Sequence, residues 1–160
     1  MPAPLIALLL LQAPPVLNQS IVVTGAWQPI PLEESDRAVL SLPVRPNALL
    51  LNSIADVLRL HPSLDLRQRA PNLLQADLSI RGATFGQTLV LLNGRRMNDP
   101  QSGHHNLDLP APLQSVQSVE ILSGAGSTLY GADATGGVVN IVTSPPEASE
   151  IRLRAAAGNF

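Results

Sequence analysis

Residues 119–143 read VEILSGAGSTLYGADATGGVVNIVT and contain the clearest structural pattern in the chain. The pattern predicts a strand that ends near Leu122, a connector with five glycines, and a second strand over residues 138–142. The second apolar run stops at Ser144-Pro145-Pro146. Two strands joined by a compact connector cannot cover their own apolar faces. We therefore expect a larger packed sheet, whose other strands come from the rest of the chain.

Patterns before this stretch predict the remaining elements. Asn52 or Ser53 can cap a helix that ends before Pro62, because the residue preceding a proline avoids helical geometry. The expected strands lie over residues 38–42, 76–82 and 88–92, and the last is followed by the hairpin signal Asn93-Gly94. Together these patterns favour an α+β domain with short helices and long loops.

The composition excludes several classes of function. A chain of 160 residues is expected to form one domain with a real core. All 10 basic residues are arginine, and with 12 acidic residues they give a net charge of −2, which does not favour binding to nucleic acid or to an anionic membrane. The absence of cysteine excludes disulfides, thiolate metal sites and cysteine nucleophiles.

The first 25 residues contain two apolar segments. Leu5 to Leu11 is too short to span a bilayer, which needs about 20 residues. Followed by Ala13, it favours a signal peptide over residues 1–13 rather than a buried helix. Ile21 to Gly25, with the sequence IVVTG, is β-prone and precedes a proline-rich, acidic linker. That segment is either a strand donated to another protein's sheet edge or the start of this domain's own sheet.

The sequence contains no pattern that supports catalysis. The glycine-rich segment 123–128 follows a strand, but the chain lacks the lysine that a Walker loop requires, and Leu129 stands where a dinucleotide-binding pattern needs its third glycine. No G-x-S-x-G nucleophile elbow occurs. His104 and His105, flanked by two aspartates, resemble metal ligands, but their adjacency favours a solvated loop. We therefore predict no catalytic site, no metal site and no cofactor.

Several motifs occur together in a fixed order. They are IADVL at residues 54–58, IRG at 80–82, LVLLNGR at 89–95 and LYGADATGGVVNIVT at 129–143. In this order they resemble the plug, or hatch, domain of TonB-dependent outer-membrane receptors, most of all the branch that takes up vitamin B12 and siderophores. The likeness covers residues 53–143. Ile21 to Gly25 is similar to the family's TonB box.

The resemblance implies a fold and a division of the chain. The fold is a small mixed plug-domain sheet of four strands with short helices and long loops. The chain would divide into a signal peptide at 1–13, a linker segment at 14–46 that contains a TonB box at 20–25, and the plug domain at 47–146. Residues 147–160 would form the first strand of a 22-stranded β-barrel, and the rest of that barrel is missing from this sequence. Because Ser123-Gly124-Ala125 replaces the family's usual Arg-Gly-Pro, whose arginine commonly pairs with barrel carboxylates, we expect weaker locking of plug to barrel.

The resemblance also implies transport rather than catalysis. The plug would close the barrel in the outer membrane and gate energy-coupled uptake of a metal chelate such as a siderophore or cobalamin. The periplasmic C-terminal domain of TonB would add a strand to the segment Ile21, Val22, Val23, Thr24 and Gly25. The substrate-facing loops would contribute Arg69, Asn72, Gln75, Asn98, Gln101, His104 and His105.

Two other interpretations stay open. A stand-alone periplasmic or secreted ligand-binding module would keep the fold and use the same loops without a barrel. A neighbouring reading frame of alternating strands would favour the receptor over this module. An enzyme that binds a phosphorylated ligand at the glycine connector is the least favoured, and nucleotide binding measured by calorimetry would support it.

Overall fold

The computed structural model of the chain describes residues 21–22, 25–48, 50–69 and 76–144, together with Ile151 and Ala155. The predicted signal peptide, and nearly all of the predicted barrel strand at 147–160, lie outside these residues. Within the described part, no helix combines the length and the hydropathy that crossing a membrane requires.

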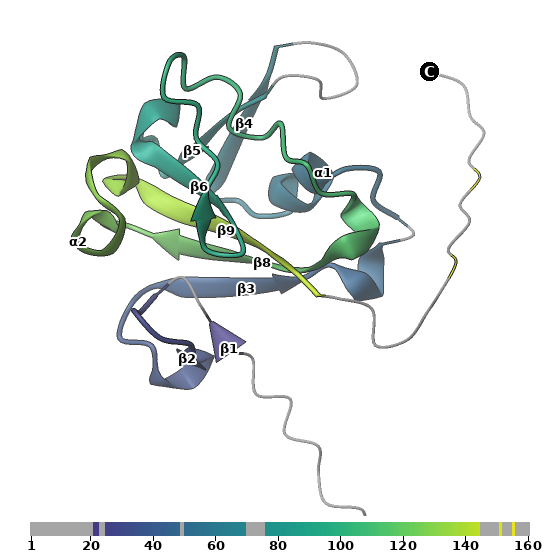
Figure 1. The fold of residues 1–160 in the computed structure, drawn as a ribbon, viewed down its shortest axis with the longest axis horizontal. Coiled ribbons are helices and arrows are strands. Elements are labelled where there is room, and N and C mark those ends of the chain that lie inside the picture. Colours follow the sequence, from purple (N-terminus) through teal and green to yellow (C-terminus); the bar gives the residue numbers. More distant parts are fainter. Residues whose placement is uncertain are drawn as a thin grey trace, which may run out of the picture.

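A five-stranded mixed sheet forms the centre of the fold (Figure 1). β8 (Val116–Ser123) and β9 (Gly137–Thr143) are antiparallel neighbours, which confirms the two strands predicted in residues 119–143. The order of the sheet is β3-β8-β9-β6-β7, with β3 at Val39–Pro43, β6 at Thr88–Leu92 and β7 at Arg95–Arg96. β6 and β9 run parallel, and the other neighbours are antiparallel.

The central sheet has one strand more than the four that we predicted. β7 contains only two residues, too few for any alternation to be visible in the sequence. It forms because the chain reverses at Asn93-Gly94, where φ is 50° and 77°. Positive φ at both central residues gives a hairpin turn whose twist matches that of the strands. The rest of the prediction, a mixed sheet with short helices and loops, agrees with the structure.

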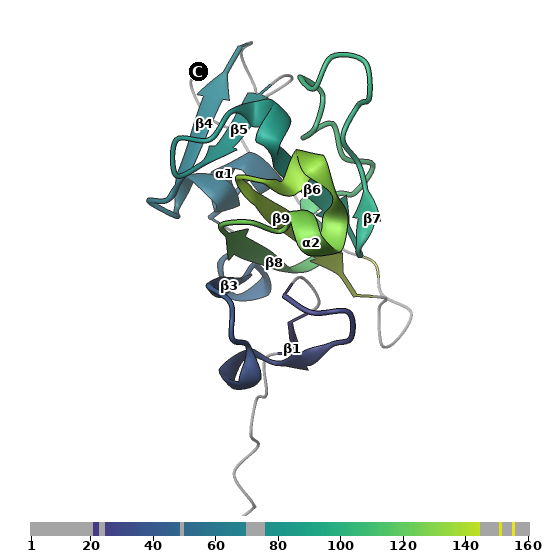
Figure 2. The same ribbon diagram turned by 90° about the vertical axis from the view of Figure 1, so that its left-hand side faces the viewer.

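One face of the sheet carries the larger part of the core. Ile121 of β8 and Ile141 of β9 are fully buried there. They belong to one apolar cluster with α1 (Ile54–Arg59) and with a separate hairpin of β4 (Leu64–Gln68) and β5 (Ala76–Ile80). Figure 2 shows α1 and this hairpin to one side of β9, and α2 to the other.

The opposite face carries a smaller cluster. Leu122 and Val138, which neighbour each other across β8 and β9, are buried beneath α2 (Ser127–Tyr130) and the 3-10 turn η6 (Ala132–Ala134). The glycine connector therefore folds back as the cover of this face. The remaining 3-10 turns are η1 (Leu32–Glu34), η2 (Arg45–Asn47), η4 (Phe85–Gln87) and η5 (Leu113–Ser115).

The predicted helix begins at a capping box. The Ser53 Oγ accepts a hydrogen bond from the Asp56 N–H at 3.2 Å, and the Asp56 carboxylate accepts one from the Ser53 N–H at 3.0 Å. Two N–H groups that a helix start leaves unpaired are thereby satisfied. The helix ends at Arg59, before Pro62, as predicted.

A buried polar pair joins β8 to β9 beneath the connector. The Asn140 Nδ2 donates to the Glu120 carboxylate at 3.0 Å, and the Asn140 Oδ1 accepts from the Gly94 N–H at 3.0 Å. Glu120 is 1% exposed and Asn140 is fully buried. Because a buried polar group without partners is costly, these bonds fix the register of β9 and the position of the turn before β7.

Candidate functional site

A buried carboxylate, Asp77 of β5, lies between the end of β4 and the loop over residues 98–106. The alternation of β5 puts Asp77 on the polar face of the hairpin, yet only 5% of its side chain is exposed. Its Oδ2 accepts a hydrogen bond from the Arg69 Nε at 2.5 Å, and its Oδ1 lies 2.9 Å from the His104 Nδ1. Asp77 thus connects the end of β4 to the loop over residues 98–106.

The electrostatics of this cluster favour the ionised carboxylate. Burial alone would raise the pKa of Asp77. The hydrogen bonds from His104 and Arg69, and then the charges of the same two side chains, outweigh burial and hold the pKa of Asp77 below its usual value. The carboxylate therefore attracts both side chains at neutral pH.

An aromatic contact completes the cluster. The Phe85 ring of η4 lies against the His104 ring, with centroids 4.4 Å apart and planes inclined at 33°. Beside it is a hollow of about 230 Å³ on the outer face of the β4–β5 hairpin. The hollow is lined by Asp65, Arg67, Asp77, Ser79, Gly82, Ala83, Thr84 and Phe85. The lining combines charged and hydroxyl side chains with apolar surface, including the Phe85 ring.

The loop over residues 98–106 is shaped by its own hydrogen bonds. The Asp99 carboxylate accepts bonds from the Ser102 hydroxyl and from the N–H groups of Gln101 and Ser102. These bonds, the one from the Ser102 hydroxyl first, lower the pKa of Asp99. The buried Asn106 accepts a bond from the Asp99 N–H at 3.3 Å. Hydrogen bonds within the loop therefore fix its shape.

The structure brings together only part of the predicted substrate-facing set. Arg69 and His104 meet at Asp77, whereas His105 pairs with Asp108 at 2.8 Å on the exposed side of the loop. Asn98 is engaged by β6: its Oδ1 accepts from the Val90 N–H at 2.7 Å, and its Nδ2 donates to the Thr88 carbonyl at 3.1 Å. Gln101 is exposed at the tip, and Asn72 and Gln75 lie outside the described residues.

Sequence reasoning did not single out Asp77 or Phe85. Asp77 occupies an ordinary polar position in an alternating strand, and 27 residues separate it from His104. No spacing rule links them, because the contact arises only when the loop folds over the hairpin. Among the residues that the structure describes, no group of three or more potential ligands among His, Cys, Asp and Glu could hold a metal ion.

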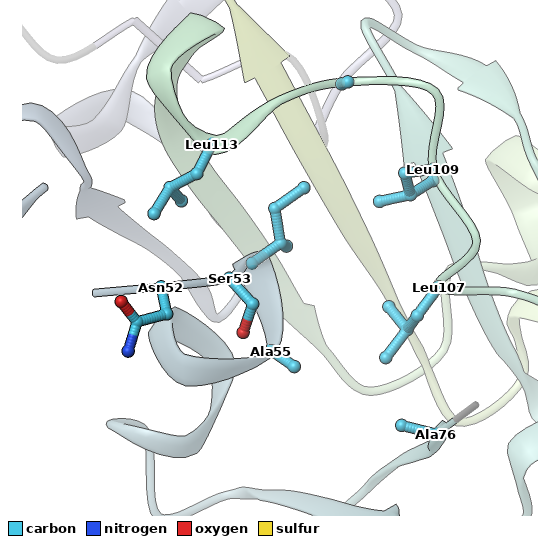
Figure 3. A pocket seen from close by; sticks show the side chains of 9 residues that line it. Asn52, Ser53, Ala55, Ala76, Leu107, Leu109 and Leu113 are labelled. Carbon is cyan, nitrogen blue, oxygen red and sulfur yellow. The ribbon is translucent and has the colours of Figure 1, made fainter. Parts of the chain in front are cut away.

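A second hollow, lined mainly by residues with apolar side chains, lies between the start of α1 and the loop before β8 (Figure 3). Its volume is about 220 Å³. Figure 3 shows Leu107 and Leu109 on one side of it and Leu113 on the other. Its lining consists of Asn52, Ser53, Ile54, Ala55, Ala76, Leu107, Leu109, Ala111 and Leu113.

Two arginines from distant positions bind the glycine connector. Arg37 donates to the Ala125 carbonyl at 3.3 Å and to the Thr128 hydroxyl at 3.2 Å. Arg96 of β7 donates to the Tyr130 carbonyl at 2.6 Å and pairs with the Asp133 carboxylate. The connector, which lacks an arginine of its own at residue 123, is thus held to both edges of the sheet.

The predicted TonB box begins in a small hairpin outside the central sheet. β1 (Ile21–Val22) pairs antiparallel with β2 (Ile30–Pro31), with Val22 opposite Ile30. Val23 and Thr24 lie outside the described residues, and Gly25 is buried against β3. In the described part of the chain, β1 has β2 as its only neighbour and adds no strand to the five-stranded sheet.

Comparison with known protein families identifies the family to which this chain belongs. Residues 47–138 match the model of the TonB-dependent receptor plug domain. The chain belongs to this family. The resemblance found in the sequence motifs is thereby confirmed. The family consists of outer-membrane receptors and is a transport family rather than a catalytic one.

Relatives and solved structures agree with this assignment. The chain is 35% identical over 98 residues to the vitamin B12 transporter BtuB of Vibrio vulnificus (strain CMCP6), a match that covers 61% of the chain and 16% of the transporter. The siderophore receptor PirA of Acinetobacter baumannii is similar at 28% identity and a TM-score of 0.53, over 67% of the chain and 17% of the receptor.

A second solved structure matches a larger share of the chain. The structure of the FpvAI–pyocin S2 complex shares the fold at a TM-score of 0.64 and 21% identity, over 79% of the chain and 17% of the matched chain. The sequence therefore spans about one-sixth of the length of the proteins that it matches.

Proposed function

We propose that this plug domain gates the energy-coupled uptake of a metal chelate, such as a siderophore or cobalamin, through an outer-membrane β-barrel. The observation that carries the proposal is the separation of the chain into a packed five-stranded sheet and a small N-terminal hairpin that is not part of it. A segment outside the sheet can pair with another protein without dismantling the core of the plug.

The coupling segment in this proposal is Ile21 to Gly25. The periplasmic C-terminal domain of TonB adds a strand to it, and main-chain hydrogen bonds supply the affinity. A short segment suffices, because such bonds depend on the backbone rather than on particular side chains. Mechanical work applied at the hairpin then rearranges the plug and opens a path past it.

The substrate class is supported by the outer loops and by the relatives. Arg69 is half exposed, and its terminal guanidinium nitrogens have no hydrogen-bond partner among the described residues. With His104 and the hollow beside Phe85, it offers donors to an anionic chelate. The similar proteins are a vitamin B12 transporter and a siderophore receptor.

A backbone substitution tests the coupling step. Val22→Pro removes an N–H within the proposed strand, whereas Val22→Ala keeps it. We expect the Val22→Pro chain to lose capture by the immobilised C-terminal domain of TonB down to background, and the Val22→Ala chain to be captured as well as the unaltered chain. Equal capture of all three would rule out pairing at this segment.

A further inference from the structure

One large apolar side chain of the N-terminal hairpin is turned to solvent. Trp27, the only tryptophan of the chain, is 81% exposed in the bend over residues 25–28 between β1 and β2. A single exposed apolar residue is common and needs no explanation by itself. Tryptophan is nevertheless the residue type most enriched among those that dominate the energy of protein interfaces. Whether the exposed indole marks an interface therefore depends on the residues around Trp27.

The bend that presents Trp27 is held against the plug. Gly25 is buried, and a Cβ at that position would lie 3.0 Å from the Val39 Cγ2 and 3.1 Å from the Ser35 Oγ. The backbone can approach β3 this closely because residue 25 has no side chain. Pro29 and Pro31 restrict the backbone after the bend. A preformed bend loses little conformational entropy when a partner binds.

Trp27 is also close to the strand that the proposed partner would use. It follows Val22 by five residues, so at most about 18 Å of extended chain separates the two. One edge of β1 is paired with β2, and the described residues place no strand along the other edge. A partner strand added there would bring the rest of its own domain next to the bend.

The charges beside the bend specify the partner further. Glu34 and Asp36 are exposed in the segment that follows β2, and the described residues form no ion pair with either carboxylate. The nearby Arg37 is directed to the connector instead. The bend therefore presents an indole near two carboxylates that the described residues leave without an ion pair.

We infer that Trp27 anchors the C-terminal domain of TonB, and that its indole enters an apolar pocket flanked by Lys or Arg side chains of that domain. The inference rests on the proposed function, because it requires pairing at Ile21 to Gly25. It adds a side-chain contact to an interaction otherwise made by the main chain. Glu34 and Asp36 would contribute long-range attraction, which speeds association at low salt.

Calorimetric titration of the full chain with the C-terminal domain of TonB tests the inference. We expect Trp27→Ala to weaken binding by about tenfold or more, as for a typical interface anchor. Leu50→Ala is the matched control, because Leu50 is 83% exposed but follows η2, in another part of the chain. Truncation of a mostly exposed side chain is expected to leave the fold intact, which circular dichroism verifies for both variants.

The outcomes separate the two proposals. A loss of fivefold or more for Trp27→Ala, with Leu50→Ala unchanged, supports the anchor. A smaller loss, or an equal loss in both variants, overturns it. If Val22→Pro abolishes binding while Trp27→Ala does not weaken it, the anchor is wrong and the coupling strand stands. If Val22→Pro binds as tightly as the unaltered chain, the proposed coupling strand itself is wrong, whatever Trp27→Ala does.

Discussion

At the scale of single residues, Asp77 holds the end of β4 and the loop over residues 98–106 together. It is nearly fully buried, and its two partners come from opposite sides of the cluster, Arg69 after β4 and His104 in the loop over residues 98–106. Removing one member of such a cluster leaves the others without their counter-charge. The cost of that loss, rather than the strength of any one hydrogen bond, makes Asp77 important.

Asp77→Asn is expected to destabilise the chain at neutral pH by about 1.5–3 kcal/mol, the range for hydrogen bonds to charged groups. The folded pKa of Asp77 lies below the ordinary value of 3.8. Its contribution to stability is therefore fully present above that ordinary value and is lost as the pH falls through the lower folded pKa. Chemical denaturation at a series of pH values measures the difference between the two proteins.

The difference in unfolding free energy should shrink as the pH falls from about 5 toward 3. Asp65→Asn is the matched control, since Asp65 lies on the same hairpin but is more than half exposed and pairs only with the exposed Arg67. A difference for Asp77→Asn that does not change between pH 7 and pH 3 would contradict the assigned ion pairs.

At the scale of elements, the sequence predicted the parts whose signals are local. The capping box at Ser53, the Asn93-Gly94 turn and the alternation of β5 lie within a few residues of the elements that they specify. The pairing of β1 with β2 was not predicted, because two-residue strands show no periodicity. Asn98 stays a predicted substrate-facing residue, and the structure adds that its amide binds the backbone of β6, a contact that no local pattern shows.

The close packing between β9, β8 and β5 gives a prediction at Gly137. Its φ is 150°, and a Cβ there would lie 2.5 Å from the Leu122 carbonyl oxygen and 2.7 Å from the Ile80 Cδ1. Gly137→Ala should therefore lower the free energy of unfolding by about 2 kcal/mol or more, through overpacking and backbone strain. Urea denaturation measures this change.

Gly86→Ala is the control for that measurement. Nothing lies within 4 Å of a Cβ at residue 86, and its backbone conformation suits other residues. We expect a change of less than about 1 kcal/mol there. Equal effects of the two substitutions would show that the packing at the start of β9 is looser than described.

At the scale of the whole molecule, the plug is a sheet covered on both faces, with the β1–β2 hairpin below its β3 edge (Figure 1) and the polar cluster around Asp77 on the β4–β5 hairpin. This arrangement separates the proposed contact with TonB from the proposed contact with substrate. The two must communicate through the sheet, since β3 follows the hairpin and pairs with β8. The chain covers only about one-sixth of the matched receptors.

Single-channel conductance in a planar bilayer tests the central claim most directly. The plug of a vitamin B12 transporter is replaced by residues 47–144 of this chain, and the chimera is compared with the intact transporter and with the plug-deleted barrel. We predict that the chimera conducts as little as the intact transporter, because the domain fills the lumen. A chimera whose plug resists proteolysis but which conducts as much as the empty barrel would contradict the assignment of this domain as the gate.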